Sequence, residues 1–488
     1  MRWMLLGASL LAVGCGSDGG ASGGSGGTFA SGGGAGTSAT GGSGGVAWGG
    51  SAGNITGGSS SGGTAASAGT SSSGGAATGG TGGAAAGGAA AGGAATGGSA
   101  TGGAATGGTG GMEVPPHLRP QDHTSQLLFN PAKDEFNISY HSFRIPSIVR
   151  STKGTLIAFA EGRQCSAADY GNINLVYKRS FDDGKTWTNL AEVVGSGAGT
   201  WGNPTAVVDE DTGTIWLFMN WNAENISQNP GTNPCTGNPT TAVGPGDRPV
   251  YLSKSTDDGA TWTKPVNMTA TLQPNGNAWD AVGPGVGIYT SVGATAGRLI
   301  IPAIQRNIYS DDHGVTWKYK SIPGGTSEGT VVELSDGKLQ RNDRATGSRW
   351  NTAARRWLST GTIEGSFPAF APHDTLLDPR VEGSAIRYST NPHRIFFLNP
   401  ASTVGRCKMR VRISYDDGAT WPISRQLHDT LTAQETCDKN LGGYSSMTKT
   451  ADFHVAALVE RIEADGSHRG IEVHRFNLPW VLDGTPEP

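Results

Sequence analysis

Several features that would assign a chain of 488 residues to a common functional class are scarce in this sequence. The formal net charge is −4, and neither a long basic run nor an acidic tail occurs, which argues against a nucleic-acid-binding surface. There are only five cysteines, none in a C-x-x-C pair, and the ten histidines show no H-E-x-x-H spacing. We therefore expect no metal site.

Long hydrophobic runs are scarce as well. The one near the N-terminus, residues 3–13, follows the basic Arg2 and is too short to cross a bilayer as a mature helix, but it suits a signal peptide. It leads into the letters LAVGC, which end at Cys15 and resemble a bacterial lipobox. We expect residues 1–15 to be a lipoprotein signal peptide with Cys15 lipidated. An ordinary signal peptide that happens to contain a cysteine is the alternative.

Glycine, by contrast, is abundant. Most of the 79 glycines lie between Gly16 and Gly111, in a tract of Gly, Ala, Ser and Thr. Such a tract offers little apolar surface to offset the entropy of ordering it, so we expect residues 16–113 to be a disordered tether with a reach of roughly 55 Å. Residues 114–488 have globular composition and predict one all-β domain.

These N-terminal features predict a location outside the cytoplasm. Gly16 after the cysteine favours the bacterial outer membrane or the cell surface, with release from the anchor left open. The lipid anchor is then the only expected membrane contact, and we expect a monomer.

One eight-residue pattern, S-x-D-x-G-x-T-W, occurs four times in the globular part. The copies begin at Ser180, Ser255, Ser310 and Ser414. An Asp side chain can bond backbone amides in a tight turn, and Gly supplies a positive φ. Strand-like runs precede the copies, as at residues 174–178 and 250–254. Each copy is therefore predicted to be a β-hairpin turn, and the recurrence suggests propeller blades, some of which lack the motif.

These repeats resemble the Asp boxes of sialidases. The resemblance covers about residues 126–480 and includes motifs of bacterial exo-α-sialidases of the Asp-box, or BNR-repeat, family (glycoside hydrolase family 33 type). It implies a six-bladed β-propeller in which the boxes lie on the face away from the active site. We therefore assign the boxes a structural role.

The family binds its substrate through arginines. Sialic acid carries a carboxylate on its anomeric carbon, and a bidentate guanidinium is suited to hold it. The letters HSFRIP resemble the family motif that supplies the first arginine. The resemblance implies three carboxylate-binding residues, Arg144, Arg344 and Arg406. It also places Arg163 near the 4-hydroxyl of the sugar. Arg410 and Arg412 compete with Arg406, which we prefer because it lies at the mouth of the strand.

The resemblance also implies three catalytic residues, Asp169, Glu328 and Tyr444. A carboxylate nucleophile would be repelled by the substrate's own carboxylate, and sialidases use a tyrosine instead. Asp169 is expected to be the acid and base, and Glu328 the partner of the nucleophile Tyr444. Glu333, further along the strand that Glu328 begins, is expected to be structural.

Together these motifs imply an exo-α-sialidase that removes terminal sialic acids from glycans, glycoproteins or glycolipids with retention of configuration, without any cofactor. A non-catalytic sialoglycan-binding propeller is one alternative. A trans-sialidase, or a hydrolase of another 2-keto sugar acid, is a second. The sequence does not determine the linkage or the 5-substituent of the sugar.

Four cysteines remain in the globular part: Cys165, Cys235, Cys407 and Cys437. Three pairings are possible, and we favour Cys407 with Cys437 because both flank the same candidate site. Residues 222–248 form a long insertion rich in Asn, Gly, Pro and Thr, which either roofs the site or is inert.

Overall fold

The computed structural model describes residues 115–131, 139–195, 197, 199–273, 278–428, 436–437, 442–462 and 468–488. The predicted signal peptide, Cys15 and the whole Gly-rich tract, residues 16–113, lie outside these residues. The described part is all-β, and its helices are short: η1 (Pro116–Leu118), α1 (Thr269–Leu272), η2 (Gly293–Thr295), α2 (Gly347–Thr352) and α4 (Leu478–Leu482). None of them is long and apolar enough to cross a membrane.

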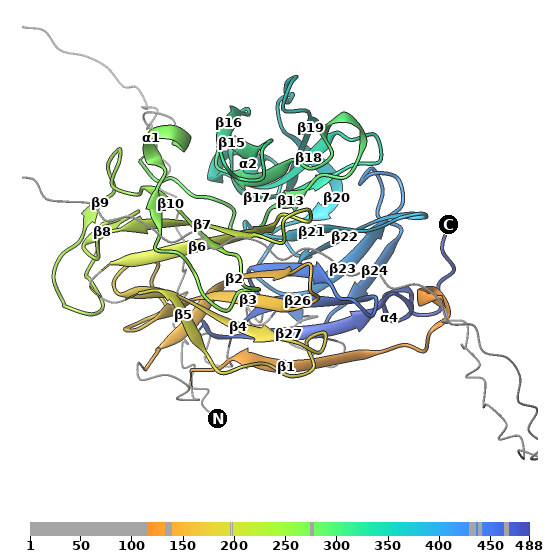
Figure 1. Ribbon diagram of the computed structural model, residues 1–488, viewed down its shortest axis with the longest axis horizontal. Coiled ribbons are helices and arrows are strands. Elements are labelled where there is room, and N and C mark those ends of the chain that lie inside the picture. Colours follow the sequence, from red (N-terminus) through yellow and green to blue (C-terminus); the bar gives the residue numbers. More distant parts are fainter. Residues whose placement is uncertain are drawn as a thin grey trace, which may run out of the picture. The chain divides into compact units, whose positions relative to one another are not determined.

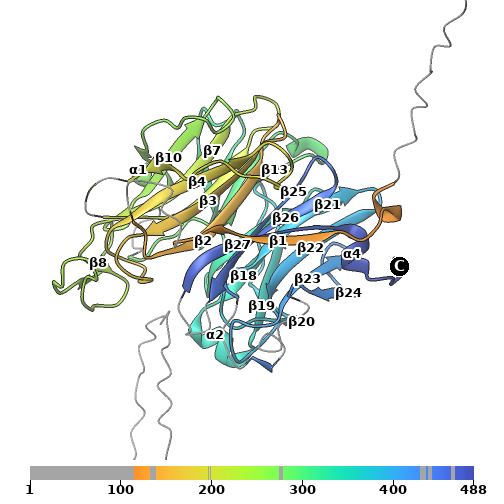
Figure 2. The same ribbon diagram turned by 90° about the horizontal axis from the view of Figure 1, so that it is seen from below.

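The first strand of the described region completes a sheet whose other strands come from the end of the chain. In this sheet β1 (His123–Phe129) pairs with β27 (His468–Asn477), which is followed by β26 (His454–Ile462) and β25 (Ser445–Lys449). All these pairings are antiparallel, and Figures 1 and 2 show β1 running beside β27.

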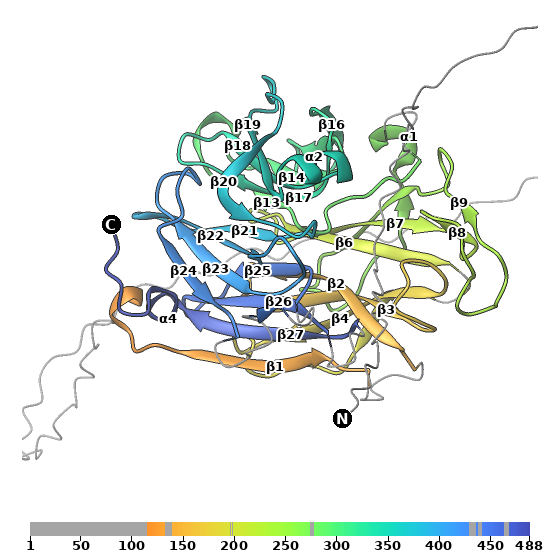
Figure 3. The ribbon, with the colours of Figure 1, turned by 180° about the vertical axis from the view of Figure 1, so that it is seen from behind.

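Three further sheets each consist of four consecutive antiparallel strands. The first contains β13 (Ile288–Tyr289), β14 (Leu299–Ala303), β15 (Arg306–Ser310) and β16 (Lys318–Ser321). The second contains β17 (Thr326–Glu333), β18 (Leu339–Ala345), β19 (Arg355–Gly361) and β20 (Ala371–Leu377). The third contains β21 (Ser384–Thr390), β22 (His393–Pro400), β23 (Met409–Ser414) and β24 (Ile423–Gln426). Figure 3 shows the third sheet beside β25 and β26.

The largest sheet is two such sets joined edge to edge. One set is β2 (Ser142–Arg150), β3 (Leu156–Arg163), β4 (Ile173–Ser180) and β5 (Ala191–Val194). The other is β6 (Thr200–Val208), β7 (Ile215–Asn222), β10 (Val250–Ser255) and β11 (Val266–Asn267), with β12 (Gly285–Val286) along β6. A single parallel pair, Ile173 with Thr200, joins the sets. The insertion at 222–248 contains the short parallel strands β8 (Ile226–Ser227) and β9 (Thr241–Ala242).

The hydrophobic core lies between neighbouring sheets. All residues of β3 are buried, because both faces of its sheet are covered. Its first five residues, LIAFA, accordingly form a continuous apolar run and do not alternate with polar residues. Ile148 and Leu156 of one sheet, for example, share a cluster with Leu458 and Val473 of the next. This stacking of sheets on sheets brings their inner strands together at the site described below.

The four S-x-D-x-G-x-T-W repeats are hairpin turns, as predicted, and each joins the third and fourth strands of its set. In the first copy the backbone N–H and the hydroxyl of Thr186 donate to the two carboxylate oxygens of Asp182, at 2.8 and 2.7 Å. The same bonds recur in the other three copies. Two successive residues have positive φ, Asp183 and Gly184 in this copy, whereas the sequence indicated only the glycine.

The first of these positive-φ residues connects each repeat to the first hairpin turn of the neighbouring sheet. Asp183 accepts from Ala451, Asp258 from Thr155 and Asp417 from Ser335, while His313 pairs with Asp209. The sheet of β25, β26, β27 and β1 has no such repeat, because its third and fourth strands, β27 and β1, are not consecutive in the chain.

Candidate active site

A cavity of about 750 Å³ collects charged side chains from sheets that are far apart in the sequence. It contains all seven residues that the sequence predicted: Arg144, Arg163, Asp169, Glu328, Arg344, Arg406 and Tyr444. Arg144 lies on β2 and Glu328 on β17, while Tyr444 directly precedes β25. These are the first strands of three different sheets, so the stacking of the sheets creates the site.

Tyr444, Glu328 and Arg344 are in direct contact. The hydroxyl of Tyr444 donates to Oε2 of Glu328 at 2.5 Å and accepts from Arg344 at 2.7 Å, and Arg344 also contacts Glu328 at 2.6 Å. Burial raises the pKa of Tyr444 well above its usual value, Arg344 opposes this, and Glu328 adds to it. The phenol is therefore neutral, and its proton already points at a carboxylate that can take it.

Asp169 lies in the loop after β3, as predicted, and contacts two arginines. Its Oδ1 is 3.1 Å from Arg144 and 2.8 Å from Arg163, and its side chain is 53% exposed. Burial alone would raise the pKa of Asp169, but Arg163 and Arg144 lower it below the usual range. The carboxylate is therefore ionised and is one of two anions that pair with Arg144.

Arg144 is held from behind by a residue that the sequence analysis missed. Glu460 of β26 accepts from Nε and Nη2 of Arg144 at 3.1 and 3.3 Å, and from the backbone N–H of Ile145 and Tyr444 at 3.0 and 3.2 Å. Ile145 has φ 58°, a costly conformation for a β-branched residue. Glu460 thus fixes both an arginine and the backbone of the tyrosine. Glu460 is the only acidic residue in the largely apolar strand HVAALVERI, and an isolated acid in such a strand is a sequence signal that could have marked it as a site residue.

Arg406 completes the cationic wall of the cavity. Its guanidinium lies 5.4 Å from the centre of the Tyr444 ring, and that of Arg144 lies 5.6 Å from the same ring. Burial lowers the pKa of Arg406, and the nearby cations Arg144 and Arg344 act in the same direction. Its competitors Arg410 and Arg412 do not line the cavity, and Arg412 donates to Asn399 inside its own sheet.

Arg163 touches the cavity, but protein groups occupy most of its guanidinium. It donates to Glu161 at 2.6 and 3.0 Å and to the carbonyl of Ala167 at 2.5 Å. Glu161 also accepts from the N–H of Asn203 at 2.9 Å. The predicted contact of Arg163 with a sugar hydroxyl stays a prediction, whereas its contact with Asp169 is a feature of the structure.

The insertion at 222–248 contributes to this cavity. Gln228 and Arg248 line it, and the Arg248 guanidinium stacks 4.1 Å from the ring centre of Trp279 while donating to Asn203 at 2.6 Å. Both residues lie in the loops of the insertion, and no sequence motif marks either of them as a site residue. The insertion therefore forms part of the site wall, in agreement with the first of the two roles considered for it.

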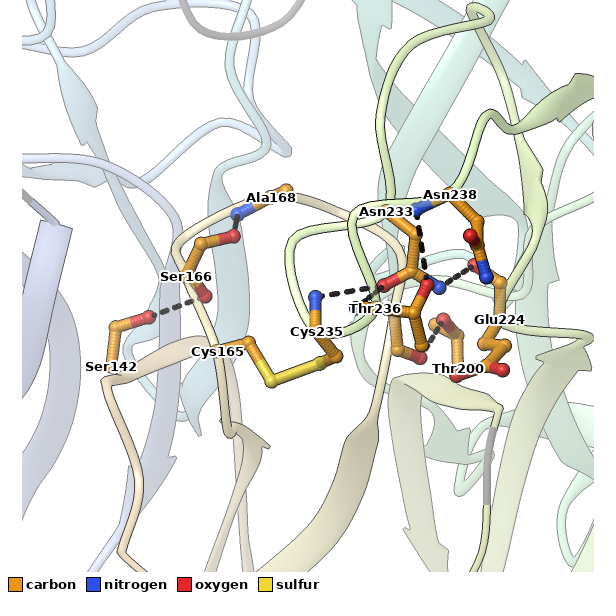
Figure 4. The surroundings of a disulfide bond; sticks show 11 residues. Ser142, Cys165, Ser166, Ala168, Thr200, Glu224, Asn233, Cys235, Thr236 and Asn238 are labelled. Carbon is orange, nitrogen blue, oxygen red and sulfur yellow. Dashed lines mark hydrogen bonds between the residues drawn. A yellow bond between two sulfur atoms is a disulfide. The ribbon is translucent and has the colours of Figure 1, made fainter.

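Two disulfide bonds flank the cavity. Cys407 is bonded to Cys437, the pairing favoured from the sequence, and Cys165 to Cys235. The first lies next to Arg406. The second, drawn in Figure 4, ties the loop that carries Asp169 to the insertion. In that loop the carbonyl of Gly171 accepts from Thr200 at 3.0 Å, so its far end is attached as well.

The structural glutamate predicted on β17 also has a definite place. Glu333 lies outside the cavity, where it accepts from the backbone N–H of Ser291 and Val292 and pairs with Arg387 at 2.8 Å. It therefore joins three neighbouring sheets and does not contact Tyr444.

Comparison with known proteins agrees with this geometry. A family model described as a BNR repeat-like domain matches residues 154–455. An exo-alpha-sialidase of Aspergillus fumigatus is 47% identical over 378 residues, covering 74% of this chain and 90% of the fungal protein. An exo-alpha-sialidase of Arthroderma benhamiae is 45% identical over 390 residues, covering 75% of this chain and 91% of that protein. These two relatives are fungal, whereas the sequence motifs resemble those of bacterial members.

Solved structures give the same result. The Hadza microbial sialidase Hz136 matches with a TM-score of 0.56 and 27% identity, covering 70% of this chain and 66% of that one. An intramolecular trans-sialidase of Ruminococcus gnavus, at 19% identity and a TM-score of 0.61, covers 75% of this chain and 99% of its own and shares the fold. The family model and the fungal relatives, matched over most of their length, place the chain in the BNR-repeat sialidase family.

Proposed function

We propose that this protein is an exo-α-sialidase that hydrolyses terminal sialic acids from glycoconjugates, with retention of configuration through a covalent bond to Tyr444. The observation that carries this proposal is the contact of the Tyr444 hydroxyl with Glu328 and Arg344, opposite Asp169 in one cavity. The names and the 45–47% identity of the two fungal relatives support it.

In the proposed complex the carboxylate of the sugar replaces Asp169 as the anion facing the arginines. Arg144, Arg344 and Arg406 converge on the cavity, and guanidinium groups hold a carboxylate through paired N–H donors. Glu460 keeps Arg144 in position from behind, so little side-chain entropy is lost on binding. Arg163 and Arg248, which also line the cavity, are our candidates for contacts with the rest of the sugar.

The first step forms the covalent intermediate. The oxygen of Tyr444 attacks the anomeric carbon while its proton moves to Glu328, and the bond to the glycosidic oxygen breaks as Asp169 donates a proton to that oxygen. A neutral phenol approaches the substrate carboxylate without charge repulsion. Arg344 stabilises the phenolate character that develops on Tyr444.

The second step releases the sugar. Asp169, now ionised, takes a proton from water as the water attacks the anomeric carbon, and the bond to Tyr444 breaks as Glu328 returns the proton. Two displacements at one carbon give retention. The pKa of Asp169 must rise for the first step, and a substrate carboxylate that pairs with Arg144 provides the cause, because it withdraws part of the positive field that lowers this pKa.

We also propose that the four-stranded sets are blades of a six-bladed propeller, closed where β1 joins β27. Lipidation of Cys15 and anchoring outside the cytoplasm by residues 16–113 remain part of this proposal. The two disulfides support it, since disulfides persist in oxidising compartments.

The test is release of 4-methylumbelliferone from its α-sialoside by the full chain, with NMR to identify the first anomer formed. Turnover that yields the α-anomer first supports retention, and the β-anomer first contradicts it. A folded protein that binds sialic acid without turnover would be a glycan-binding propeller. A product transferred to added lactose, or cleavage of a different 2-keto sugar acid only, would indicate the second alternative.

A further inference from the structure

A second cluster of charged and imidazole side chains lies outside the cavity, between two sheets. His428 follows β24, whereas Glu472 and His474 lie on β27. One ligand atom from each of the three residues lies within 4.8 Å of the other two. The proposed reaction uses none of them.

The distances in this cluster fit a small cation with nitrogen and oxygen ligands. Nε2 of His428 is 3.1 Å from Oε2 of Glu472, and Nε2 of His474 is 3.3 Å from the same oxygen. In a tetrahedral zinc site with bonds of about 2.0–2.1 Å, neighbouring ligand atoms are roughly 3.3 Å apart. Two histidines and one carboxylate are also a common set of protein ligands for zinc.

Two of the three residues, His474 and Glu472, are also held by groups behind them, as metal ligands are held by outer-shell contacts. Nδ1 of His474 lies 3.2 Å from Nε2 of His123, which leaves Nε2 of His474 directed at Glu472. The other oxygen of Glu472 accepts from Arg461 at 2.9 Å. Such outer contacts fix the tautomer of a ligating histidine and the direction of a ligating carboxylate.

The burial of the cluster is also suitable. The side chains of His428, Glu472 and His474 are only 11%, 16% and 1% exposed, so the three ligand groups are largely shielded from solvent.

The position of the cluster suggests that a bound ion would have a structural role. It spans the β21–β24 sheet and the sheet of β25–β27 and β1, which carries no S-x-D-x-G-x-T-W repeat to join it to its neighbour. We propose that His428, Glu472 and His474 bind a zinc-type divalent ion that links these two sheets. No local spacing motif marks this cluster in the sequence, because His428 lies 44 residues from Glu472.

The second such cluster, Asp209, Asp211 and His313, supplies the matched control. His313 occupies the repeat position that contacts the neighbouring hairpin turn, and its bond to Asp209 at 3.0 Å is the counterpart of the Asp contacts in the other three copies. The contact between His313 and Asp209 therefore has a structural explanation that needs no ion.

The test uses the full chain without an affinity tag, treated with a chelator, dialysed and then titrated with Zn²⁺. We expect about one tightly bound Zn²⁺ per wild-type chain and a rise in Tm, because an ion that binds the folded state alone stabilises it. His428→Ala and Glu472→Gln should weaken binding by at least roughly 10–100-fold and abolish the rise in Tm. His313→Ala should bind Zn²⁺ as the wild type does.

Sialoside hydrolysis by Glu472→Gln reports whether this variant is folded, since Glu472 lies outside the cavity. Absence of bound Zn²⁺ in the wild type would overturn the proposal. Unchanged Zn²⁺ binding in both His428→Ala and Glu472→Gln would overturn it too. Either result leaves the proposed sialidase activity untouched, because that activity uses no residue of this cluster.

Discussion

The four hairpin repeats and the cavity both contain acidic residues, but the two regions use them differently. In the repeats, both oxygens of an aspartate such as Asp182 bond to Thr186, four residues away. In the cavity, partners are distant in the chain: Tyr444 meets Glu328 across 116 residues, and Arg144 meets Glu460 across 316. A carboxylate already satisfied by its own turn has little capacity left for a ligand.

This difference separates structural from functional polar residues more clearly than residue type does. The repeats are local units, and each one lies where the third strand of a set connects to the fourth. The cavity exists only where inner strands of different sheets meet, and arginines outnumber acidic residues in its lining. Substitutions in the cavity should therefore lower mainly catalytic activity, whereas substitutions in the repeats should lower mainly the free energy of unfolding.

The largest expected effect is on catalysis. Tyr444→Phe removes the nucleophilic hydroxyl and the contact with Glu328, so kcat should fall by roughly 10²–10⁴-fold, a typical contribution of such groups. Tyr388→Phe is the control, since this buried hydroxyl donates only to the carbonyl of Phe453. Steady-state hydrolysis of the fluorogenic sialoside measures both. Equal activities in the two variants would contradict the role of Tyr444.

Next in size is the exchange of an arginine at the wall of the cavity. Arg406→Lys retains the charge but loses the paired donors, so kcat/KM should fall by about 10–100-fold, corresponding to ~1.5–3 kcal/mol for hydrogen bonds to a charged group. Arg412→Lys alters a buried contact with Asn399 away from the cavity and should lower Tm with little change in kcat/KM. The reverse pattern would assign the substrate contact to Arg412.

Removal of each disulfide should affect a different kinetic parameter, because the two bonds lie on different sides of the cavity. Cys165→Ser with Cys235→Ser frees the loop of Asp169, so kcat should fall by roughly 10-fold, because small displacements of a catalytic group are costly. Cys407→Ser with Cys437→Ser frees the segment next to Arg406 and should mainly raise KM. Separate kcat and KM values for both double variants check this. An identical loss of Tm with no kinetic difference would reduce both bonds to structural cross-links.

The two regions also differ in how much of them the sequence predicts. The repeats specify their own turns, so the hairpins could be predicted from eight residues at a time, their preceding strands from short upstream runs, and their structural role from the family resemblance. Their bonds to the neighbouring sheet could not, since Asp183 reaches Ala451 only after the sheets have stacked.

The same limit applies to the cavity. Seven of its residues were predicted because they lie in motifs that resemble those of a family. Glu460 and Arg248 lie in no motif, and their roles depend on which strands and loops become neighbours in space. The metal-type cluster of His428, Glu472 and His474 was missed for the same physical reason.

The smallest expected effect lies in the repeats and depends on pH. Three hydrogen bonds to Asp257, from Ser255 and from the amide and hydroxyl of Thr261, lower its pKa from 3.8 to about 2, so the folded state prefers the ionised carboxylate. Its contribution to stability is therefore complete above about pH 5 and is lost as the pH falls toward 2.

Asp257→Asn should lower the free energy of unfolding by about 1 kcal/mol at pH 7, since Asp257 is exposed and solvent screens its charge. The gap in Tm between wild type and variant should close between pH 5 and pH 2, while kcat at pH 6 stays unchanged. Thermal unfolding across this range provides the measurement. A gap that persists at pH 2 would mean that the hydrogen-bond geometry of the turn, and not the carboxylate charge, stabilises the repeat. A drop in kcat would connect the repeats to catalysis and remove the contrast between the two regions.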